Sequence, residues 1–588
     1  MDSVDSGAVF EVWAPLAHDV RVVVDGTTHD MRRADGRSGW WTCDVVKVAG
    51  QRYGFSLNDG SSWHGPFPDP RSRRQPDGIH GLSEVVDSAF EWTDDHWTNY
   101  ELQGQVIYEL HVGTFTPSGT FEGIIEKLDY LVELGVTTIE LMPVQPFGGT
   151  RNWGYDGVEW FAVQESYGGP EGLKKLVDAA HHKGVGVFLD VVFNHFGPDG
   201  NYNGLFGPYT TAGTTGWGDV VNLSGAASDE VRAYVLDAVR QWLDEFHIDG
   251  LRLDAVHSYD DRAAYSIMEE INLVADAIEV KNGPNPIIIA ESDLNDPRII
   301  ADYSRGGYGL DAQWLDDVHH ALHSVVSGET MAYYEDFGTI EILADTLRHG
   351  YRFRHDWSNY RGRTHGRALN LAEIAPWKLI TYTTTHDQVG NRAAGDRPSM
   401  NLTPAQHALK AAVIFFSPFT PMIFMGEESY AQTPFPFFVS HDDENLNKLT
   451  REGRAHEFAR YGWNMSTVPD PADPATFESA KIDWNFDDAA VDMYETYKVL
   501  LTLRRQLGLA RDDLRELHVD HGTTPEPRDG YPGSWLTMGY DEVILAANFS
   551  NEPVTAPVGG ELLYSYTNPE VGATETKLDP WGFAIIRR

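Results

Sequence analysis

The order of apolar and polar positions divides the chain into three stretches. Residues 1–92 alternate in short runs such as VFEVW and VRVVV, separated by Gly, Asp and Pro turns, which predicts an immunoglobulin-like β-sandwich. Residues 93–509 contain nearly continuous apolar runs with helical segments between them, and residues 510–588 return to β-like runs such as VILAANF. The pattern therefore predicts a large α/β domain between two small β-sandwich domains.

Eight apolar runs in the middle stretch are typical of strands in a parallel sheet that is covered on its faces. In chain order they are VIYELHV, VTTIELMPV, VGVFLDVVF, IDGLRLDAV, PIIIAES, LDAQWLDDV, LITYTTTHD and TPMIFMGEE. The segments between them carry helix signals: residues 170–184 have Pro near the first turn and end at Gly184, and a second helix is expected to begin with Ser228 as its cap. This alternation predicts a closed (β/α)8 barrel with inserted loops.

Charge and cysteine content narrow the classes of function. The 45 Lys and Arg residues face 88 Asp and Glu residues, a formal net charge of −43 that should repel phosphate backbones and anionic membranes. We therefore expect neither nucleic acid nor a membrane as a partner. The single cysteine, Cys43, excludes an intramolecular disulfide and a cysteine-pair redox centre. Because the N-terminus lacks the basic start and apolar run of a signal peptide, we expect a cytoplasmic protein.

Polar clusters close four of the predicted strands. They are DVVFNH (190–195), GLRLDAVH (250–257), AESD (290–293) and TTHDQVGN (384–391). Taken singly, each has a structural explanation as a helix cap or a loop anchor. A barrel, however, brings the carboxyl ends of all its strands to one mouth, and buried carboxylates are costly unless they are used or paired. The four clusters together therefore predict an active site.

Two of these carboxyl groups suit the cleavage of a glycosidic bond, which needs one protonated and one ionised carboxyl group. Arg252 lies two residues before Asp254, so their side chains share a face and the guanidinium can keep the carboxylate ionised, as a nucleophile requires. Glu291 ends an apolar strand, and such neighbours should raise its pKa and keep it protonated as an acid. Retaining enzymes hold the two groups about 5 to 5.5 Å apart.

The four clusters, in this order, closely resemble the four signature regions of the α-amylase family. The segment WAP (13–15) also resembles the N-terminal β-sandwich of its branching, debranching and trehalose-releasing members. The resemblance implies that Asp254 is the nucleophile, that Glu291 is the general acid/base and that Asp387 is the third, transition-state-stabilising carboxylate.

The same resemblance implies a set of substrate contacts. His195, Arg252 and His386 match residues that contact the sugar on the non-reducing side of the cleaved bond, and Asp190 matches a carboxylate that braces the site. Their neighbours are included in the expected binding set: Leu253, Ala255, Val256, His257, Gln388, Val389, Gly390 and Asn391. In many members the residue matching Asn194 helps to hold calcium, but convincing further ligands are absent from the sequence. We predict no metal and no cofactor.

Several loop segments resemble the trehalose-releasing hydrolases of the family. These are NHFGPDGNY, FMGEE, TPFPFFVSHDDE and REGRAHEFARYGW. The resemblance implies hydrolysis of the α-1,4 bond next to the terminal trehalose unit of maltooligosyltrehalose, action on related α-glucans, and a maltooligosyltrehalose synthase that works in sequence with the enzyme. A branching enzyme would instead transfer the glycosyl unit, and a debranching enzyme would cleave α-1,6 bonds. A non-catalytic carbohydrate-binding protein would not need all three carboxylates.

Two further clusters are candidates for substrate binding. DDVHH, comprising Asp316, Asp317, Val318, His319 and His320, ends the sixth strand, and the resemblance places it beyond the cleaved bond. Its alternative explanation is a metal site or an acidic helix start. In WGYD, Trp153, Tyr155 and Asp156 offer aromatic faces and a carboxylate to a sugar ring, although a packed loop explains them nearly as well.

Overall fold

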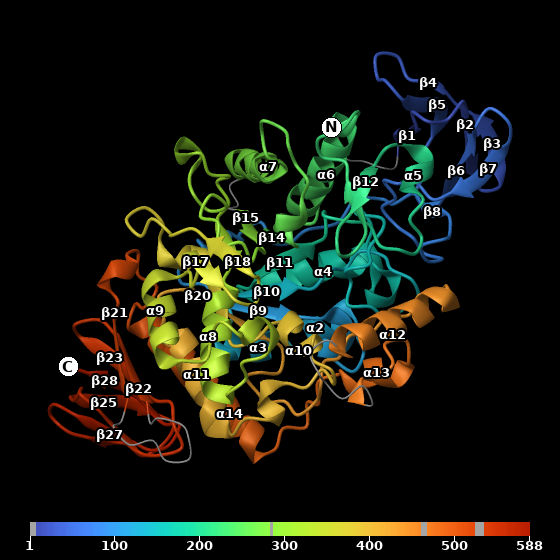
Figure 1. The fold of residues 1–588 in the computed structure, drawn as a ribbon. Coiled ribbons are helices and arrows are strands. Elements are labelled where there is room, and N and C mark those ends of the chain that lie inside the picture. The colour runs from blue at the N-terminus through green and yellow to red at the C-terminus, as the bar shows by residue number, and fades with distance from the viewer. Residues whose placement is uncertain (1–6, 283–285, 460–466, 524–533) are drawn as a thin grey trace.

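The computed structural model describes residues 7–282, 286–459, 467–523 and 534–588. Two small β-domains lie on opposite sides of a central barrel, with the N-terminal strands blue and the C-terminal strands red in Figure 1. The predicted fold class, a (β/α)8 barrel between two β-sandwich domains, is confirmed. The predicted boundaries after residues 92 and 509 stay predictions.

The N-terminal domain consists of two antiparallel sheets whose facing residues form a common core. One sheet has the order β1–β5–β4 and the other β3–β2–β6–β7, with β8 paired to β6. Phe10, Val22 and Phe55 are completely buried between the sheets. The strands are β1 (Val9–Trp13), β2 (Asp19–Val24), β3 (Thr27–Asp30), β4 (Arg32–Arg33), β5 (Trp40–Val46), β6 (Arg52–Asn58), β7 (Trp63–Phe67) and β8 (Ser83–Glu84).

All eight predicted parallel strands form and close into a barrel. In order around the barrel they are β9 (Ile107–Leu110), β10 (Thr138–Leu141), β11 (Gly186–Val191), β14 (Gly250–Leu253), β15 (Ile287–Ala290), β16 (Ala312–Trp314), β19 (Leu379–Tyr382) and β20 (Thr420–Phe424). Ile107, Phe188, Ile289 and Ile380 belong to one buried cluster with residues of several strands, which fills the lower barrel. The barrel is therefore a packed support whose upper end is open to polar residues.

Helices cover the outside of the barrel after most strands. The main ones are α3 (Leu128–Leu134), α4 (Gly169–His182), α6 (Ser228–Arg240), α7 (Ile267–Asn282), α8 (Asp316–Ser327), α9 (Ile340–His349), α11 (Pro404–Phe416), α12 (Glu444–Ala459) and α14 (Asp488–Gln506). Between β15 and β16 the chain instead forms a loop with the short 3-10 turn Tyr303–Arg305. There are also two hairpins. The first, β12 (Thr210–Thr214) with β13 (Asp219–Val221), lies between β11 and α6, and the second, β17 (Arg354–Ser358) with β18 (Arg363–Gly366), lies between α9 and β19.

One predicted helix start differs from the structure. Ser228 is the first residue of α6 and not its cap, because the preceding Ala227 occupies the cap position with φ 61° and no side chain caps the helix. The acidic residues expected in the first turn, Asp229 and Glu230, are present and complement the positive end of the helix dipole.

The C-terminal domain contains a five-stranded sheet, β21–β22–β23–β28–β25, and a three-stranded sheet, β24–β27–β26. The strands are β21 (His518–Thr523), β22 (Ser534–Gly539), β23 (Val543–Asn548), β24 (Val554–Ala556), β25 (Glu561–Ser565), β26 (Glu570–Val571), β27 (Thr576–Leu578) and β28 (Phe583–Arg587). Arg348 of α9 donates to the carbonyl of Val519 in β21, which ties this domain to the barrel. No helix among the described residues is both long enough and apolar enough to cross a membrane.

Candidate active site

Four neighbouring barrel strands each direct one titratable side chain into the upper barrel. Glu109 of β9 is the register partner of Glu140 of β10, and Asp190 of β11 is the partner of Arg252 of β14. None of the four is more than 1% exposed. Since the residues before and after them face the helices, this layer follows from the two-residue period of the strands. Burying such groups is tolerated only when their charges are paired or when the group becomes neutral.

The guanidinium of Arg252 is the centre of this arrangement. Its Nη1 donates to Asp190 Oδ2 at 2.7 Å and to Asp254 Oδ1 at 2.8 Å, while its Nη2 lies 3.2 Å from Glu291 Oε2. The guanidinium carbon also lies 4.1 Å from the ring centre of Trp314. One buried cation thus contacts three carboxyl groups from three strand ends, which brings the predicted nucleophile and the predicted acid to the same place.

Asp254 follows β14 and is held on both oxygens. Besides the contact of Oδ1 with Arg252, its Oδ2 accepts a 2.6 Å hydrogen bond from Asn194 Nδ2. The side chain is 13% exposed, so it is nearly buried and still reachable from the mouth. A carboxylate fixed by two donors on defined sides suits attack on a bound sugar carbon.

Glu291 is placed differently, although it touches the same arginine. Burial raises the pKa of Glu291 to about 8, the contact with Arg252 opposes this, and the negative charges of Asp254 and Asp387 add to it. Its Oε2 accepts the backbone N–H of Ala255 at 2.6 Å. Ala255 adopts the left-handed conformation, with φ 41°, which is unfavourable for a residue with a Cβ and is typical of functional sites. The result is a carboxyl group that remains protonated at neutral pH.

Asp387 lies in the first turn of the short helix α10 (His386–Gly390). The preceding Thr385 forms a capping box with Gln388, which fixes the start of the helix. Asn391 donates to Asp387 Oδ1 at 3.1 Å, and the Asp387 side chain is 39% exposed. This carboxylate is therefore the most open of the three predicted ones and faces the mouth of the barrel.

The DDVHH segment forms the start of α8 and has two faces. Asp316 accepts hydrogen bonds from Tyr382 and Gln388, and Asp317 accepts the backbone N–H of Arg352. A cleft is lined by Asp316, Asp317 and His320, among others. His319 points elsewhere: its Nδ1 bonds to the Thr383 carbonyl oxygen at 2.5 Å and its Nε2 to Tyr334 at 2.9 Å. Val318 is completely buried.

The WGYD segment is more buried than a free sugar-binding platform would be. Trp153 is 4% exposed, its ring stacks on Phe435, and its indole N–H donates to the carbonyl of Pro436. A Cβ on Gly390 would come within 2.1 Å of the Trp153 ring, which explains the glycine there. Tyr155 lies parallel to His386, with ring centres 5.1 Å apart.

Other predicted residues lie in the walls of the site. Tyr155 donates to Asp190 at 2.6 Å, and Asp156 accepts from Asn152 at 2.6 Å. The His195 ring bonds to the Asn194 side chain at 2.5 Å and to the Tyr155 carbonyl oxygen at 3.0 Å. His257 is half-buried. Three members of the expected binding set are buried in the apolar core with no more than 4% of their surface exposed: Leu253, Val256 and Val389.

Four residues at the site do not belong to the predicted catalytic and substrate-binding set. Asn194 contacts Asp254, Glu109 contacts His386, Arg361 lines the cleft beside α8, and Trp217 lies near His195. Glu109 had a detectable signal, because it is a charged residue inside the apolar run VIYEL. Arg361 and Trp217 lie on inserted loops, where neither the spacing of apolar residues nor the position of strand ends predicts functional residues.

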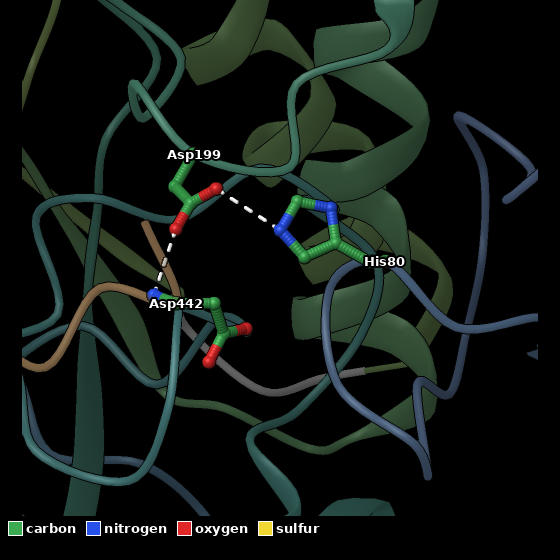
Figure 2. A group of neighbouring side chains, drawn as sticks. All are labelled: His80, Asp199 and Asp442. Atoms are coloured by element: carbon green, nitrogen blue, oxygen red, sulfur yellow. Dashed lines mark hydrogen bonds and ion pairs between the residues drawn. The ribbon is translucent and has the colours of Figure 1, made fainter. Parts of the chain in front are cut away.

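Within the described ranges, one group of three side chains brings possible metal ligands within 4.8 Å of one another: His80, Asp199 and Asp442 (Figure 2). His80 Nε2 is 3.0 Å from Asp199 Oδ1, and the backbone N–H of Asp442 donates to Asp199 Oδ2 at 3.0 Å. Both oxygens of Asp199 therefore have protein partners. We interpret the group as a link between the N-terminal domain and two barrel loops, and the prediction that the chain binds no metal stays a prediction.

The chain matches three family descriptions in the expected order. Residues 1–70 match carbohydrate-binding module 48 (isoamylase N-terminal domain), residues 67–204 match the alpha amylase catalytic domain, and residues 533–585 match a domain of unknown function. The middle match contains β11 and its polar end, which agrees with the resemblance to the α-amylase family.

Curated relatives match almost the whole chain. The malto-oligosyltrehalose trehalohydrolase of Mycobacterium tuberculosis (strain H37Rv) is 46% identical over 585 residues, which cover 98% of this chain and 99% of the relative. The chain belongs to the malto-oligosyltrehalose trehalohydrolase family. A more distant trehalohydrolase, from Saccharolobus solfataricus, is 40% identical over 588 residues, which cover 99% of this chain and 98% of that relative.

Similarity to other glucan enzymes is weaker than similarity to the trehalohydrolases. The 1,4-alpha-glucan branching enzyme of Corynebacterium jeikeium is 33% identical and matches 59% of this chain and 55% of its own. A crystal structure from Salmonella typhimurium described as an alpha amylase has a TM-score of 0.87 at 34% identity and covers 98% of this chain and 97% of its own. A crystal structure of a pullulanase from Anoxybacillus in complex with maltotriose has a TM-score of 0.72 at 19% identity. The match covers 100% of this chain and 86% of the pullulanase chain, and it supports the fold alone.

Proposed function

We propose that the protein hydrolyses, with retention, the α-1,4-glucosidic bond next to the terminal trehalose unit of maltooligosyltrehalose, and releases trehalose and a maltooligosaccharide. The observation that carries the reaction type is the contact of Asp254 and Glu291 with the two terminal nitrogens of one buried guanidinium. The relatives that carry the trehalohydrolase name over nearly the whole chain support the substrate.

In this proposal each of the three carboxyl groups has a separate catalytic role. Asp254 attacks the anomeric carbon while Glu291 gives its proton to the glycosidic oxygen, so that trehalose leaves as a neutral sugar. Glu291 then takes a proton from water, which attacks the glycosyl–Asp254 ester and frees the maltooligosaccharide with its original anomeric configuration. The open carboxylate of Asp387 stabilises the positive charge that develops on the sugar ring.

The protonation of Glu291 gives a pH prediction. Since burial raises its pKa to about 8 and the acid must be protonated to work, kcat/KM should be constant below this pH and fall about tenfold per pH unit above it. The measurement is kcat/KM on the trehalose-capped oligosaccharide between pH 6 and 10. If kcat/KM of a Glu291→Gln variant falls above pH 8 in the same way, the titration belongs to another group.

The cleft beside α8 is where we place the trehalose unit. Because Glu291 protonates the leaving oxygen, the leaving sugar must lie on its side of the site, and the cleft is lined by Ser292 and Asp293, which follow Glu291 directly. Arg361 closes the cleft and pairs with Asp293 at 2.9 Å. Polar groups and aromatic rings suit a neutral disaccharide: Asp293, Trp314, Asp316, His320, Tyr360 and Arg361 line the cleft.

The substrate assignment predicts a strong preference. A trehalose-capped oligosaccharide of six glucose units should be cleaved at least about a hundredfold faster, in kcat/KM, than maltohexaose, because buried hydrogen bonds to the trehalose hydroxyls hold the scissile bond in place. Products separated by chromatography should contain trehalose as the main small sugar. Equal rates would reject the trehalohydrolase function and keep the α-glucan hydrolase function.

Variants of two arginines on the same hairpin test the placement of trehalose in the cleft. Arg361→Met removes a cleft donor and should lower the preference about tenfold, since a lost hydrogen bond from a charged group costs about 1.5 to 3 kcal/mol. Arg363→Met is the matched control, because Arg363 is exposed and its guanidinium donates to the carbonyl of Thr364. An equal loss in both variants would contradict the placement of trehalose in the cleft.

A branching reaction is the second candidate, because it uses the same three carboxylates with a sugar hydroxyl in place of water. The partial match to a branching enzyme favours it less than the near-full-length matches favour hydrolysis. Free reducing ends without new α-1,6 branches would decide for hydrolysis. The substrate also implies a preceding step: a maltooligosyltrehalose synthase must convert a reducing maltooligosaccharide into its trehalose-capped form, and we propose that the two enzymes act in sequence.

A further inference from the structure

Glu109 is a buried carboxylate that none of the proposed steps uses. It projects from β9, and its two oxygens contact one residue of another strand end: Oε1 lies 2.5 Å from His386 Nδ1, and Oε2 accepts the backbone N–H of His386 at 3.1 Å. The two side chains are 1% and 2% exposed. Glu109 therefore fixes both the ring and the backbone where α10 begins, one residue before Asp387.

This contact determines which way the imidazole faces. With Nδ1 engaged by Glu109, the other nitrogen, Nε2, lies on the opposite edge of the ring, 3.6 Å from the open carboxylate of Asp387. Tyr155 stacks on the ring, with 22° between the planes, and Trp153 meets it edge-on at 5.5 Å. The ring cannot rotate without breaking these contacts, so Nε2 is directed at the mouth.

The charge of the ring depends on the same carboxylate. Burial opposes protonation of His386, but the negative charges of Glu109 and Asp387 outweigh it and raise the pKa of His386 to about 9. The hydrogen bond with Glu109 acts in the same direction, and Arg252 acts against it. Three further titratable groups from neighbouring strands and loops act on the ring: His111, Glu140 and Asp190.

We propose that Glu109 is a positioning residue that keeps the His386 imidazole protonated and its Nε2–H directed at a hydroxyl of the sugar on the non-reducing side of the cleaved bond. The proposal rests on the proposed function and on the resemblance to the α-amylase family, which implies that His386 contacts that sugar. A protonated ring has a donor on each nitrogen, so the bond to Glu109 leaves Nε2 as a donor at any working pH. Charge-assisted hydrogen bonds are also the stronger ones.

The test uses two isosteric substitutions in the same barrel layer. Glu109→Gln keeps the shape and removes the charge, whereas Glu140→Gln is the matched control. Burial raises the pKa of Glu140 well above its usual range, and neither of its carboxyl oxygens has a hydrogen-bond partner among the described residues, so glutamine there replaces a neutral acid by a neutral amide. The His386 titration is followed by NMR in histidine-labelled protein, with His386→Gln identifying the signal. The pH dependence of kcat/KM is measured in parallel.

We expect His386 to titrate near 9 in the unmodified protein and in E140Q, and at least two pH units lower in E109Q. The E109Q variant should then lose about tenfold more kcat/KM at pH 7.5 than at pH 5.5, and Glu109→Asp, which keeps the charge, should restore part of that loss. A titration of His386 at or below 6.5 in the unmodified protein overturns the proposal without any variant, as does an unshifted titration in E109Q. If the protein releases no trehalose, the proposed function fails, while the NMR titration still decides the role of Glu109.

Discussion

An Asp254→Asn variant should lose about 10⁴-fold or more of kcat on the trehalose-capped oligosaccharide, the largest effect that we expect from a single substitution. Asparagine keeps the shape of the side chain and can still accept the hydrogen bond from Arg252, but it cannot form the glycosyl ester. The loss should be the same on maltohexaose, since the nucleophile is common to both reactions. The release of reducing ends from both substrates measures it.

Two controls separate the nucleophile from the fold. Asp260→Asn changes an exposed carboxylate of the loop that follows Asp254, one that pairs with Arg262, and should stay within about twofold of the unmodified activity. Asp254→Gly with added azide should form a β-glucosyl azide, because the small anion then attacks from the face that Asp254 occupied. An α-linked azide product, or full activity in D254N, would contradict the role of Asp254.

The barrel and its three carboxylates were predictable because the relevant signal is local. A strand buried on both faces must be apolar, so Ile287–Ala290 stands out from its surroundings, and a polar residue at its end must either be paired or be used. The two-residue period also predicted correctly that Arg252 and Asp254 share a face, which the 2.8 Å contact confirms.

Contacts between distant segments could not be predicted in this way. The sequence gives no reason for His319 to bond to Thr383 while His320 faces the cleft, because that choice depends on how α8 packs against β19. The contact that buries Trp153 against Gly390 likewise cannot be predicted without knowing where α10 lies. The prediction that Ser228 caps its helix was wrong for a local reason. Ala227 occupies the cap position in a left-handed conformation, which residue preferences disfavour.

Glu109 belongs to a layer below the mouth that strand ends do not predict. Catalytic groups of a barrel are expected at strand ends, whereas Glu109 and Glu140 are inside their strands. A charged residue flanked by apolar ones in a central strand is itself a signal, because it must find compensation within the barrel. The partner, His386, is 277 positions away, and only the closed barrel identifies it.

The second large effect concerns Arg252 and should appear as lost stability together with lost activity. An Arg252→Met variant keeps most of the side-chain volume but leaves Asp190 buried without its counter-charge, and breaking a buried ion pair in this way costs about 3 to 5 kcal/mol. For a chain of this size, with an unfolding entropy of about 2.1 cal/mol/K per residue, we expect the thermal midpoint to fall by roughly 2 to 4 °C. Differential scanning calorimetry at pH 8 measures the shift.

The pH dependence and two further variants identify the cause of that loss. Burial already raises the pKa of Asp190 to about 7 with Arg252 in place, and removing Arg252 must raise it further. A carboxyl group with a raised pKa in the folded state destabilises increasingly as pH rises, so the deficit of R252M should be smaller at pH 5 than at pH 8. Adding Asp190→Asn should recover part of the stability but none of the activity, whereas Arg262→Met, at an arginine whose side chain is 79% exposed, should change the midpoint by less than about 1 °C. A deficit in R252M that is independent of pH and unaffected by D190N would assign the effect to packing against Trp314 and not to the buried charges.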